Sequence, residues 1–293
     1  IERNYDVSNF RKEKIKNKIA LQKELGLEEN HKTMMIGIVS RLTDQKGFDL
    51  VAYVMDELCQ DAVQIVALGT GEEQYENMFR HFAWKYPGKV SANIYYSEAM
   101  SHKIYASCDA FLMPSLFEPC GLSQLMSLRY GTVPIVRETG GLKDTVEPYN
   151  EYEKTGTGFS FMNYNAHEML DCIRYAKYIY YNKKREWNKI VDRGMAADFS
   201  WQTSAGKYQE LYDWIISLRA GKQWTLMEYP PELYEGIISI NEQLCMQQKE
   251  AVSIKNGNDI VNVMLDGVQF TIMHQNTYRT IWTCLNQQLF FPM

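Results

Sequence analysis

The chain has 293 residues, of which 45% are hydrophobic and 23% charged, and its formal net charge is −5. This composition excludes a largely disordered chain, and the acidic balance argues against a protein that binds nucleic acid through bulk positive charge. No stretch approaches the ~18 consecutive apolar residues of a transmembrane helix, so no membrane span is expected. At about 150 residues per domain, the length allows two domains.

Residues 1–30 are rich in lysine and glutamate and predict a linker and a short amphipathic helix that leads into the first domain. Gly26 would end this helix as a glycine cap. Its apolar stripe would consist of Ile15, Ile19, Leu21 and Leu25.

From residue 31 onward, short apolar runs alternate with longer amphipathic stretches. The apolar runs predict buried strands at 34–40, 63–69, 90–96, 109–115, 133–138 and 158–161. Apolar residues at helical spacing predict helices at 48–58, 72–86, 102–108, 121–131, 166–182, 184–194 and 202–219. The alternation is typical of βαβ units, so we expect an α/β domain at 31–220 with a Rossmann-like parallel sheet and helices on both faces. Ligands of such sheets bind at the carboxyl ends of the strands.

Residues 221–293 have a different texture and form an extension of unknown fold. Two β-prone runs within 259–274 flank Asp266-Gly267, which is a plausible hairpin turn. We find no catalytic motif in this extension.

The cysteines and histidines indicate neither a disulfide framework nor a metal site. The six cysteines form no Cys-x-x-Cys pair, and the five histidines lack metal-ligand spacing. Cys59 and Cys108 lie in or beside apolar runs, where buried, reduced thiols are expected. A reducing cytoplasm is the compartment that this pattern indicates. The chain begins at Ile1 with no signal-peptide pattern, and we interpret it as a piece of a longer protein.

The loop after the first strand carries two cations, Arg41 and Lys46, with Gly47 at the start of the next helix. Two cations beside a helix N-terminus favour a phosphate group, because the helix dipole and the free N–H groups add to their charge. Ordinary solvated surface cations are the alternative. Gly69-Thr70-Gly71 lacks the third glycine of a dinucleotide fingerprint and indicates a tight turn.

The loop after the strand at 109–115 carries Glu118, directly before Pro119. Proline is favoured at the first helical position, so the N–H groups of Cys120, Gly121 and Leu122 would be free to bind a ligand. The Glu118 carboxylate would either stabilise the helix dipole or accept hydroxyl groups of a sugar. No histidine motif accompanies Cys120, which argues against a catalytic cysteine.

A pair of glycines, Gly140 and Gly141, follows the strand at 133–138. Glycines at a strand end permit close backbone approach, which could bring the chain against a bound ligand. By themselves they indicate only a turn.

Three motifs in this order resemble bacterial glycogen synthase and plant starch synthase: SRLTDQKG (40–47), PSLFEPCGLSQLMSLRYGTVPIV (114–136) and TGGLKDTV (139–146). Three further segments are similar to the same family: IALQKELGL (19–27), TGTGFSF (155–161) and DFSWQTSAGKYQELYDWI (198–215). The resemblance covers residues 5–220. It implies that 31–220 is the C-terminal, nucleotide-sugar-binding domain of a GT-B glycosyltransferase, an architecture of two Rossmann-like domains.

The resemblance also implies roles for individual residues. Arg41 and Lys46 would hold the diphosphate of ADP-glucose, and Glu118 would contact the donor glucose. The remaining donor contacts would come from the adenine-stacking ring of Tyr96, the backbone of Cys120, Gly121 and Leu122, and the hydroxyl of Ser123. Glucose would pass to the non-reducing 4-OH of an α-1,4-glucan with retention, with no metal and no cofactor.

The chain departs from the family at one position and lacks one whole region. Leu116 stands where the family commonly carries arginine, which would weaken a charge network near the donor. Met126 stands where some related transferases carry a second glutamate, but the absence of that glutamate is usual for this family. The family's N-terminal domain, which binds the acceptor, is absent, so we expect that domain to be a required partner and the isolated chain to be inactive. Two alternatives stay open: a non-catalytic module that binds a nucleotide sugar or a glucan, and a transferase that uses UDP-glucose.

Overall fold

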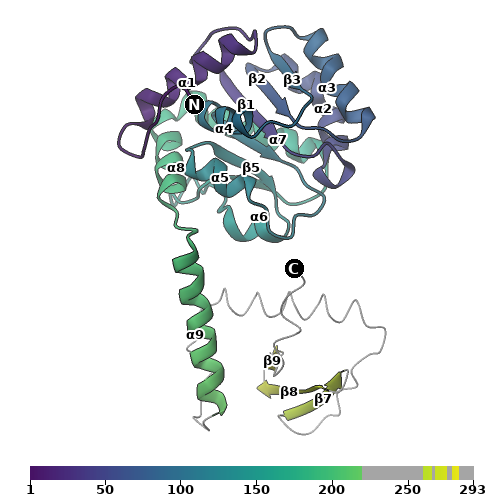
Figure 1. Cartoon of the computed structure of the whole chain (residues 1–293), viewed down its shortest axis with the longest axis vertical. Helices are drawn as coiled ribbons and strands as arrows, with labels where there is room; N and C mark the ends of the chain where they lie inside the picture. Colours follow the sequence, from purple (N-terminus) through teal and green to yellow (C-terminus); the bar gives the residue numbers. More distant parts are fainter. Residues whose placement is uncertain (220–259, 266–267, 276–278, 284–293) are drawn as a thin grey trace. The chain divides into compact units, whose positions relative to one another are not determined.

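The structure is a computed structural model, and it describes residues 1–219, 260–265, 268–275 and 279–283 (Figure 1). The chain divides into two compact units, Ile1–Phe199 and Ser200–Met293. The sequence predicted a boundary near residue 220, whereas the division falls after Phe199 and assigns helix α9 (Trp201–Arg219) to the second unit.

The first unit contains a six-stranded parallel sheet in the order β3-β2-β1-β4-β5-β6. The strands are β1 (Met34–Val39), β2 (Val63–Leu68), β3 (Val90–Asn93), β4 (Ala110–Met113), β5 (Val133–Arg137) and β6 (Phe159–Phe161). Each lies within a predicted apolar run, which confirms the Rossmann-like sheet. The strand order reverses between β1 and β4, and such a reversal opens a crevice at the carboxyl ends of the two strands.

Helices cover both faces of this sheet (Figure 1). Alternate strand residues point to opposite faces: Ile36 and Ile38 join one hydrophobic cluster, whereas Met35 joins another. The first cluster includes apolar residues of α2, α3, α7 and α8, and the second includes residues of α1 and α4. The helices are α1 (Phe10–Glu24), α2 (Phe48–Gln60), α3 (Glu73–Lys85), α4 (Glu98–Ser107), α5 (Ser123–Arg129), α6 (Gly140–Thr145), α7 (Ala166–Asn182) and α8 (Lys184–Ala196).

Helix α1 buries a partly polar face, which corrects the predicted apolar stripe. Ile15 is exposed, whereas Lys14 and Lys18 are buried. The Lys18 ammonium pairs with Asp109 at 2.6 Å, and the same carboxylate oxygen accepts the backbone N–H of Met35 at 2.8 Å. This ion pair therefore fastens α1 to the start of β1 and the residue before β4.

Lys14 contacts the C-terminal ends of two helices. Its ammonium donates to the carbonyl oxygens of Tyr105 (3.0 Å) and Ala106 (3.1 Å) in the last turn of α4. It also donates to the carbonyl of Tyr130 (3.1 Å), directly after α5. Carbonyls at helix C-termini lack intrahelical partners and carry partial negative charge, so a cation is a favourable donor there. Burial nevertheless lowers the pKa of Lys14 to about 7.

The two cysteines expected to be buried are buried free thiols. Burial raises the pKa of Cys59 to about 11 and that of Cys108 to about 12. Both thiols are therefore protonated near neutral pH and unsuited to act as nucleophiles.

The described part of the second unit holds α9 and an antiparallel sheet of β7 (Ile260–Leu265), β8 (Val268–Gln275) and β9 (Arg279–Thr283). Leu265 pairs with Val268 in the antiparallel register of β7 and β8. The predicted Asp266-Gly267 turn and the rest of 221–259 lie outside the described residues. Among the helices described, none is long and apolar enough to span a membrane.

Candidate active site

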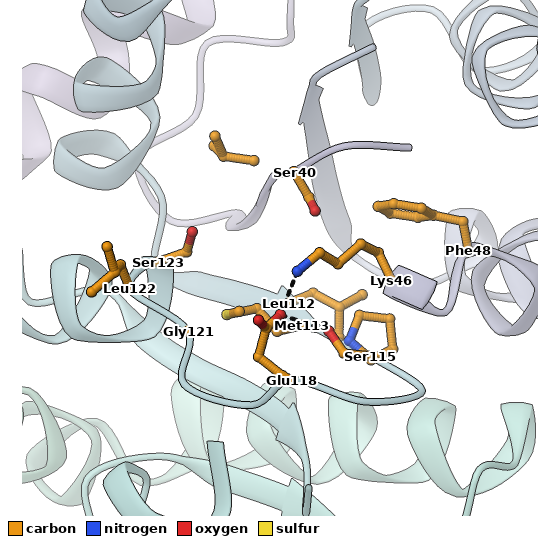
Figure 2. A pocket seen from close by; sticks show the side chains of 12 residues that line it. Ser40, Lys46, Phe48, Leu112, Met113, Ser115, Glu118, Gly121, Leu122 and Ser123 are labelled. Atoms are coloured by element: carbon orange, nitrogen blue, oxygen red, sulfur yellow. Dashed lines mark hydrogen bonds and ion pairs between the residues drawn. The ribbon is translucent and has the colours of Figure 1, made fainter. Parts of the chain in front are cut away.

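A pocket of about 80 Å³ lies where the strand order reverses, at the carboxyl ends of β1 and β4. Residues from the loops that follow these two strands close it, together with the first residue of α5 (Figure 2). Its polar lining consists of Ser40, Lys46, Ser115, Glu118 and Ser123. The position agrees with the strand-end rule that predicted where ligands bind.

Lys46 and Glu118 form an ion pair inside this pocket, although they are 72 residues apart in the chain. Figure 2 shows the ammonium and the carboxylate pointing toward one another. The Ser115 hydroxyl donates to the same carboxylate oxygen, Oε2, at 3.4 Å. Both charged side chains are largely buried. One cation and one anion are thus held together where the strand order reverses. The ammonium can bind an anionic group of a ligand, and the carboxylate can accept hydrogen bonds from a ligand's donors.

The loop that carries Glu118 is fixed by Arg137 at the end of β5. Its guanidinium donates from Nε to the carbonyl of Ser115 at 2.8 Å and from Nη2 to the carbonyl of Leu116. The N–H of Leu116 in turn donates to the carbonyl of Gln45 at 2.9 Å, which ties this loop to the one that carries Lys46. Arginine is absent at position 116, but the Arg137 guanidinium contacts the backbone there.

Helix α5 begins at Ser123, so the expectation that Pro119 is its first residue is wrong. Gly121 has a φ of +74°, in the left-handed region, and interrupts the helical path between Pro119 and Ser123. Of the three residues whose backbone N–H groups were predicted to be free, Gly121 and Leu122 line the pocket, and Cys120 is exposed outside its lining.

The glycines Gly140 and Gly141 approach the protein's own loop rather than the pocket. The N–H of Gly141 donates to the carbonyl of Glu118 at 3.0 Å. A Cβ atom at Gly140 would collide with the carbonyl oxygen of Glu118, and one at Gly141 with that of Cys120. These glycines allow the start of α6 to pack directly beneath the Glu118 loop.

Replacing Gly141 by alanine is expected to lower the free energy of unfolding by about 2 kcal/mol, because the new methyl group must displace backbone in a packed region. Urea denaturation measures this change. Gly206→Ala in α9 is the matched control, since a Cβ there meets nothing within 4 Å. Equal stability of both variants would show that the Glu118 loop is not packed against Gly141.

Like Cys120, Gly140 and Gly141, the predicted donor-site residues Arg41 and Tyr96 lie outside the pocket lining. Arg41 is exposed, and its side chain has no hydrogen bond or ion pair within the described ranges. Tyr96 is 87% exposed. The predicted strand at 90–96 ends at Asn93, and the chain then turns because Ser97 caps α4 by accepting the N–H of Met100 at 3.1 Å.

Sequence reasoning missed Ser40, Phe48 and Ser115 as lining residues, and Arg137 as the residue that positions the loop. The signal was present for three of them, because Ser40, Ser115 and Arg137 lie within two residues of the carboxyl end of a strand. Among the residues that the structure describes, no group of three histidine, cysteine or acidic side chains is placed to hold a metal ion.

Known proteins that are similar to this chain include glycosyl transferases. A family model described as "Glycosyl transferases group 1" matches residues 21–189. The glycogen synthase of Lachnospira eligens is 78% identical over 213 residues, which are 73% of this chain and 45% of that protein. The glycogen synthase of Clostridium acetobutylicum is 57% identical over 209 residues, 71% of this chain and 44% of that protein.

A solved structure extends the comparison. The catalytic domain of starch synthase IV from Arabidopsis thaliana, described as bound to ADP and acarbose, superposes with a TM-score of 0.67 at 33% identity. The match covers 74% of this chain and 45% of that one. These relatives confirm the resemblance to glycogen and starch synthases, and the chain spans less than half the length of each of these three proteins.

Proposed function

We propose, from the premise that the chain belongs to the group 1 glycosyl transferases, that it is the donor-binding half of a glycogen synthase. In this proposal glucose passes from ADP-glucose to the non-reducing 4-OH of an α-1,4-glucan with retention. The Lys46–Glu118 ion pair carries the proposal, because it lies at the reversal of the sheet in a chain 78% identical to a glycogen synthase. The starch synthase IV structure described as bound to ADP and acarbose supports a nucleotide and a glucan as ligands.

The main chemical task of such a site is electrostatic. As the bond from C1 of glucose to the diphosphate breaks, negative charge grows on the departing phosphate and positive charge on the sugar ring. The Lys46 ammonium would stabilise the phosphate, and Arg41 on the same loop would add a second cation with a bidentate fork. The Glu118 carboxylate would accept sugar hydroxyls and face the developing positive charge. No step in this scheme depends on the thiol of Cys120.

The acceptor half of the reaction must come from outside this chain. The chain corresponds to 45% of the Lachnospira eligens enzyme, and a transferase of two domains works at the cleft between them, where closure positions the substrates and excludes water. We therefore place the N-terminal GT-B domain as the partner that completes the active site.

A chimera tests this function. The N-terminal part of the Lachnospira eligens glycogen synthase is joined to this chain, and elongation of glycogen is measured with ADP-glucose and with UDP-glucose. We expect elongation with ADP-glucose, little with UDP-glucose, none from the chain alone, and a large loss in the Glu118→Gln chimera.

Three results would contradict the proposal in different ways. Elongation by the chain alone would show that it is not merely a donor half. Equal rates with both donors would remove the assignment of ADP-glucose. A chimera that binds ADP but does not elongate glycogen would favour a non-catalytic module that binds a nucleotide sugar.

A further inference from the structure

A second concave surface lies at the sheet edge formed by β6 and along α7. Two hollows of about 320 Å³ and 590 Å³ adjoin there and share Pro148, Tyr149 and Tyr175. Neither hollow shares a residue with the pocket that holds Lys46 and Glu118. The two hollows, lined in common by Tyr149 and Tyr175 and flanked by Tyr152, are named here the tyrosine groove.

The three tyrosines of the groove differ in how much of each side chain is exposed. Tyr152 is 90% exposed, Tyr175 is 37% exposed, and Tyr149 is 7% exposed on the floor of both hollows. The Tyr149 hydroxyl is buried and has no hydrogen-bond partner within the part of the chain that the structure describes. Burial, followed by the Glu186 carboxylate, raises the pKa of Tyr149, so this buried hydroxyl keeps its proton and adds no negative charge to the groove.

An exposed tyrosine at the rim and a buried one on the floor suit a ligand with both apolar faces and hydroxyl groups. A tyrosine ring is apolar on its faces and polar at its tip. A pyranose ring has the complementary surface: C–H groups on its faces and hydroxyls around its edge.

The charged groups of the groove favour a neutral, hydroxyl-rich ligand. Glu147, Glu153 and Asp171 line it, are exposed, and have no hydrogen bond or ion pair from their carboxylates among the described residues. Free carboxylates accept hydroxyl donors and repel phosphate groups, which argues against a nucleotide. No three ligating side chains of the described residues are placed to hold a metal ion.

The loop that carries Tyr152 is held in place before any ligand binds. The side-chain oxygen of Asn150 accepts the backbone N–H groups of Tyr152 (2.9 Å) and Glu153 (3.2 Å). The Arg193 guanidinium donates to the carbonyl of Gly156 at 2.6 Å, just beyond this turn. A loop that is already ordered costs less conformational entropy on binding.

We propose that the tyrosine groove is a second carbohydrate site, which holds a segment of an α-glucan chain apart from the donor pocket. The choice of an α-1,4-glucan rests on the proposed function, whereas the choice of a carbohydrate rests on the rings and carboxylates of the groove. A long glucan held at such a site stays near the enzyme between successive transfers, so the groove raises the local concentration of acceptor ends.

Calorimetric titration of the whole chain with maltoheptaose tests this site. We expect binding that Tyr152→Ala weakens at least fivefold and that Tyr152→Phe, which retains the ring, leaves within twofold of the unmodified chain. Tyr53→Ala is the matched control, because Tyr53 is 72% exposed on α2 and lines neither hollow. Tyr152 is so exposed that its removal does not threaten folding, and ADP affinity is measured on every variant.

The outcomes separate this site from the donor pocket. No maltoheptaose binding by a chain that binds ADP overturns the groove and leaves the donor site standing. Glucan binding that Tyr152→Ala does not weaken also overturns it. Binding of a lysine-rich peptide, lost in Tyr152→Ala, by a chain that does not bind maltoheptaose shows that the groove takes a basic partner instead. Glucan binding that depends on Tyr152, in a chain that does not bind ADP, supports the groove and contradicts the donor site.

Discussion

Replacing Lys46 by methionine is expected to weaken ADP binding by about 10- to 150-fold. A hydrogen bond from a charged donor contributes roughly 1.5–3 kcal/mol, which corresponds to that range of affinity. The loss should be large because Lys46 lies in the pocket at the sheet reversal, where its charge is largely removed from water. Calorimetric titration with ADP measures the effect.

The partner substitution Glu118→Gln should have the opposite sign. It removes the negative charge that pairs with Lys46 and keeps a side chain of similar shape. ADP affinity should therefore stay equal or increase. In this variant the Lys46 ammonium does not have to give up an ion pair with a carboxylate before it binds the phosphate of ADP. In the chimera the same change should abolish most transfer, because the carboxylate is expected to contact the glucose of ADP-glucose. ADP lacks this glucose, so its binding does not depend on that contact.

Two controls complete this pair of variants. Lys32→Met removes an exposed lysine away from the pocket and should leave ADP affinity unchanged. The double variant with Lys46→Met and Glu118→Gln should bind ADP as weakly as Lys46→Met alone. An ADP affinity that is indifferent to Lys46→Met would remove this lysine from the donor site.

Replacing Lys14 by methionine is expected to lower the free energy of unfolding by about 2–4 kcal/mol at pH 9. The change removes the donor that the carbonyls of Tyr105, Ala106 and Tyr130 share. Each carbonyl keeps a second donor, the hydroxyl of Tyr5 or of Thr132, so the cost is that of the lost hydrogen bonds, roughly 0.5–1.5 kcal/mol each. At pH 9 the amine of the folded protein is mostly neutral, so the unmodified protein bears little cost for a buried charge.

The same residue produces a defined pH dependence. Because burial lowers the pKa of Lys14 from 10.5 to about 7 in the folded state, the unfolded chain binds more protons than the folded one between those values. Stability from this group therefore rises with pH from 7 upward, by at most about 1.4 kcal/mol per pH unit. The stability difference between the unmodified protein and Lys14→Met should widen from pH 6 to pH 9.

Urea denaturation at pH 6, 7.5 and 9 measures that difference. The Cys59 thiol, whose pKa burial raises, is common to both proteins and is not influenced by Lys14, so its contribution cancels. Lys12→Met, an exposed position on the same helix, is the control and should change stability by less than about 0.5 kcal/mol. A difference that narrows as pH rises would show that the ammonium, rather than the neutral amine, is the favoured buried form.

The sheet was predictable from the sequence because its strands are buried on both faces. Runs such as 34–39 and 63–68 are almost wholly apolar, and neither can be mistaken for an alternating surface strand. The order of the strands then brings the loops of Lys46 and Glu118 together, since the carboxyl ends of β1 and β4 are neighbours. That juxtaposition follows from the strand-end rule and does not require knowledge of the side chains.

The buried face of α1 was not predictable from local pattern. Lys14 and Lys18 are tolerated inside because their acceptors come from segments up to 162 residues away. The residue pattern within the helix contains no information about those distant partners. A prediction from the apolar positions alone therefore chose the wrong face of α1 as the buried one. The prediction of the first residue of α5 was wrong for a different reason. Proline favours a helix start, but the left-handed conformation of Gly121, two residues after Pro119, interrupts the helical path.

Calorimetric titration of the unmodified chain with ADP, with UDP as comparison and Arg41→Ala as the variant, tests the donor-half assignment most directly. We expect clear ADP binding, at least tenfold weaker binding of UDP, and an Arg41→Ala affinity for ADP reduced at least tenfold. ADP binding that Arg41→Ala leaves unchanged, or no binding of either nucleotide by the folded chain, would contradict the account of this pocket as a nucleotide-sugar site.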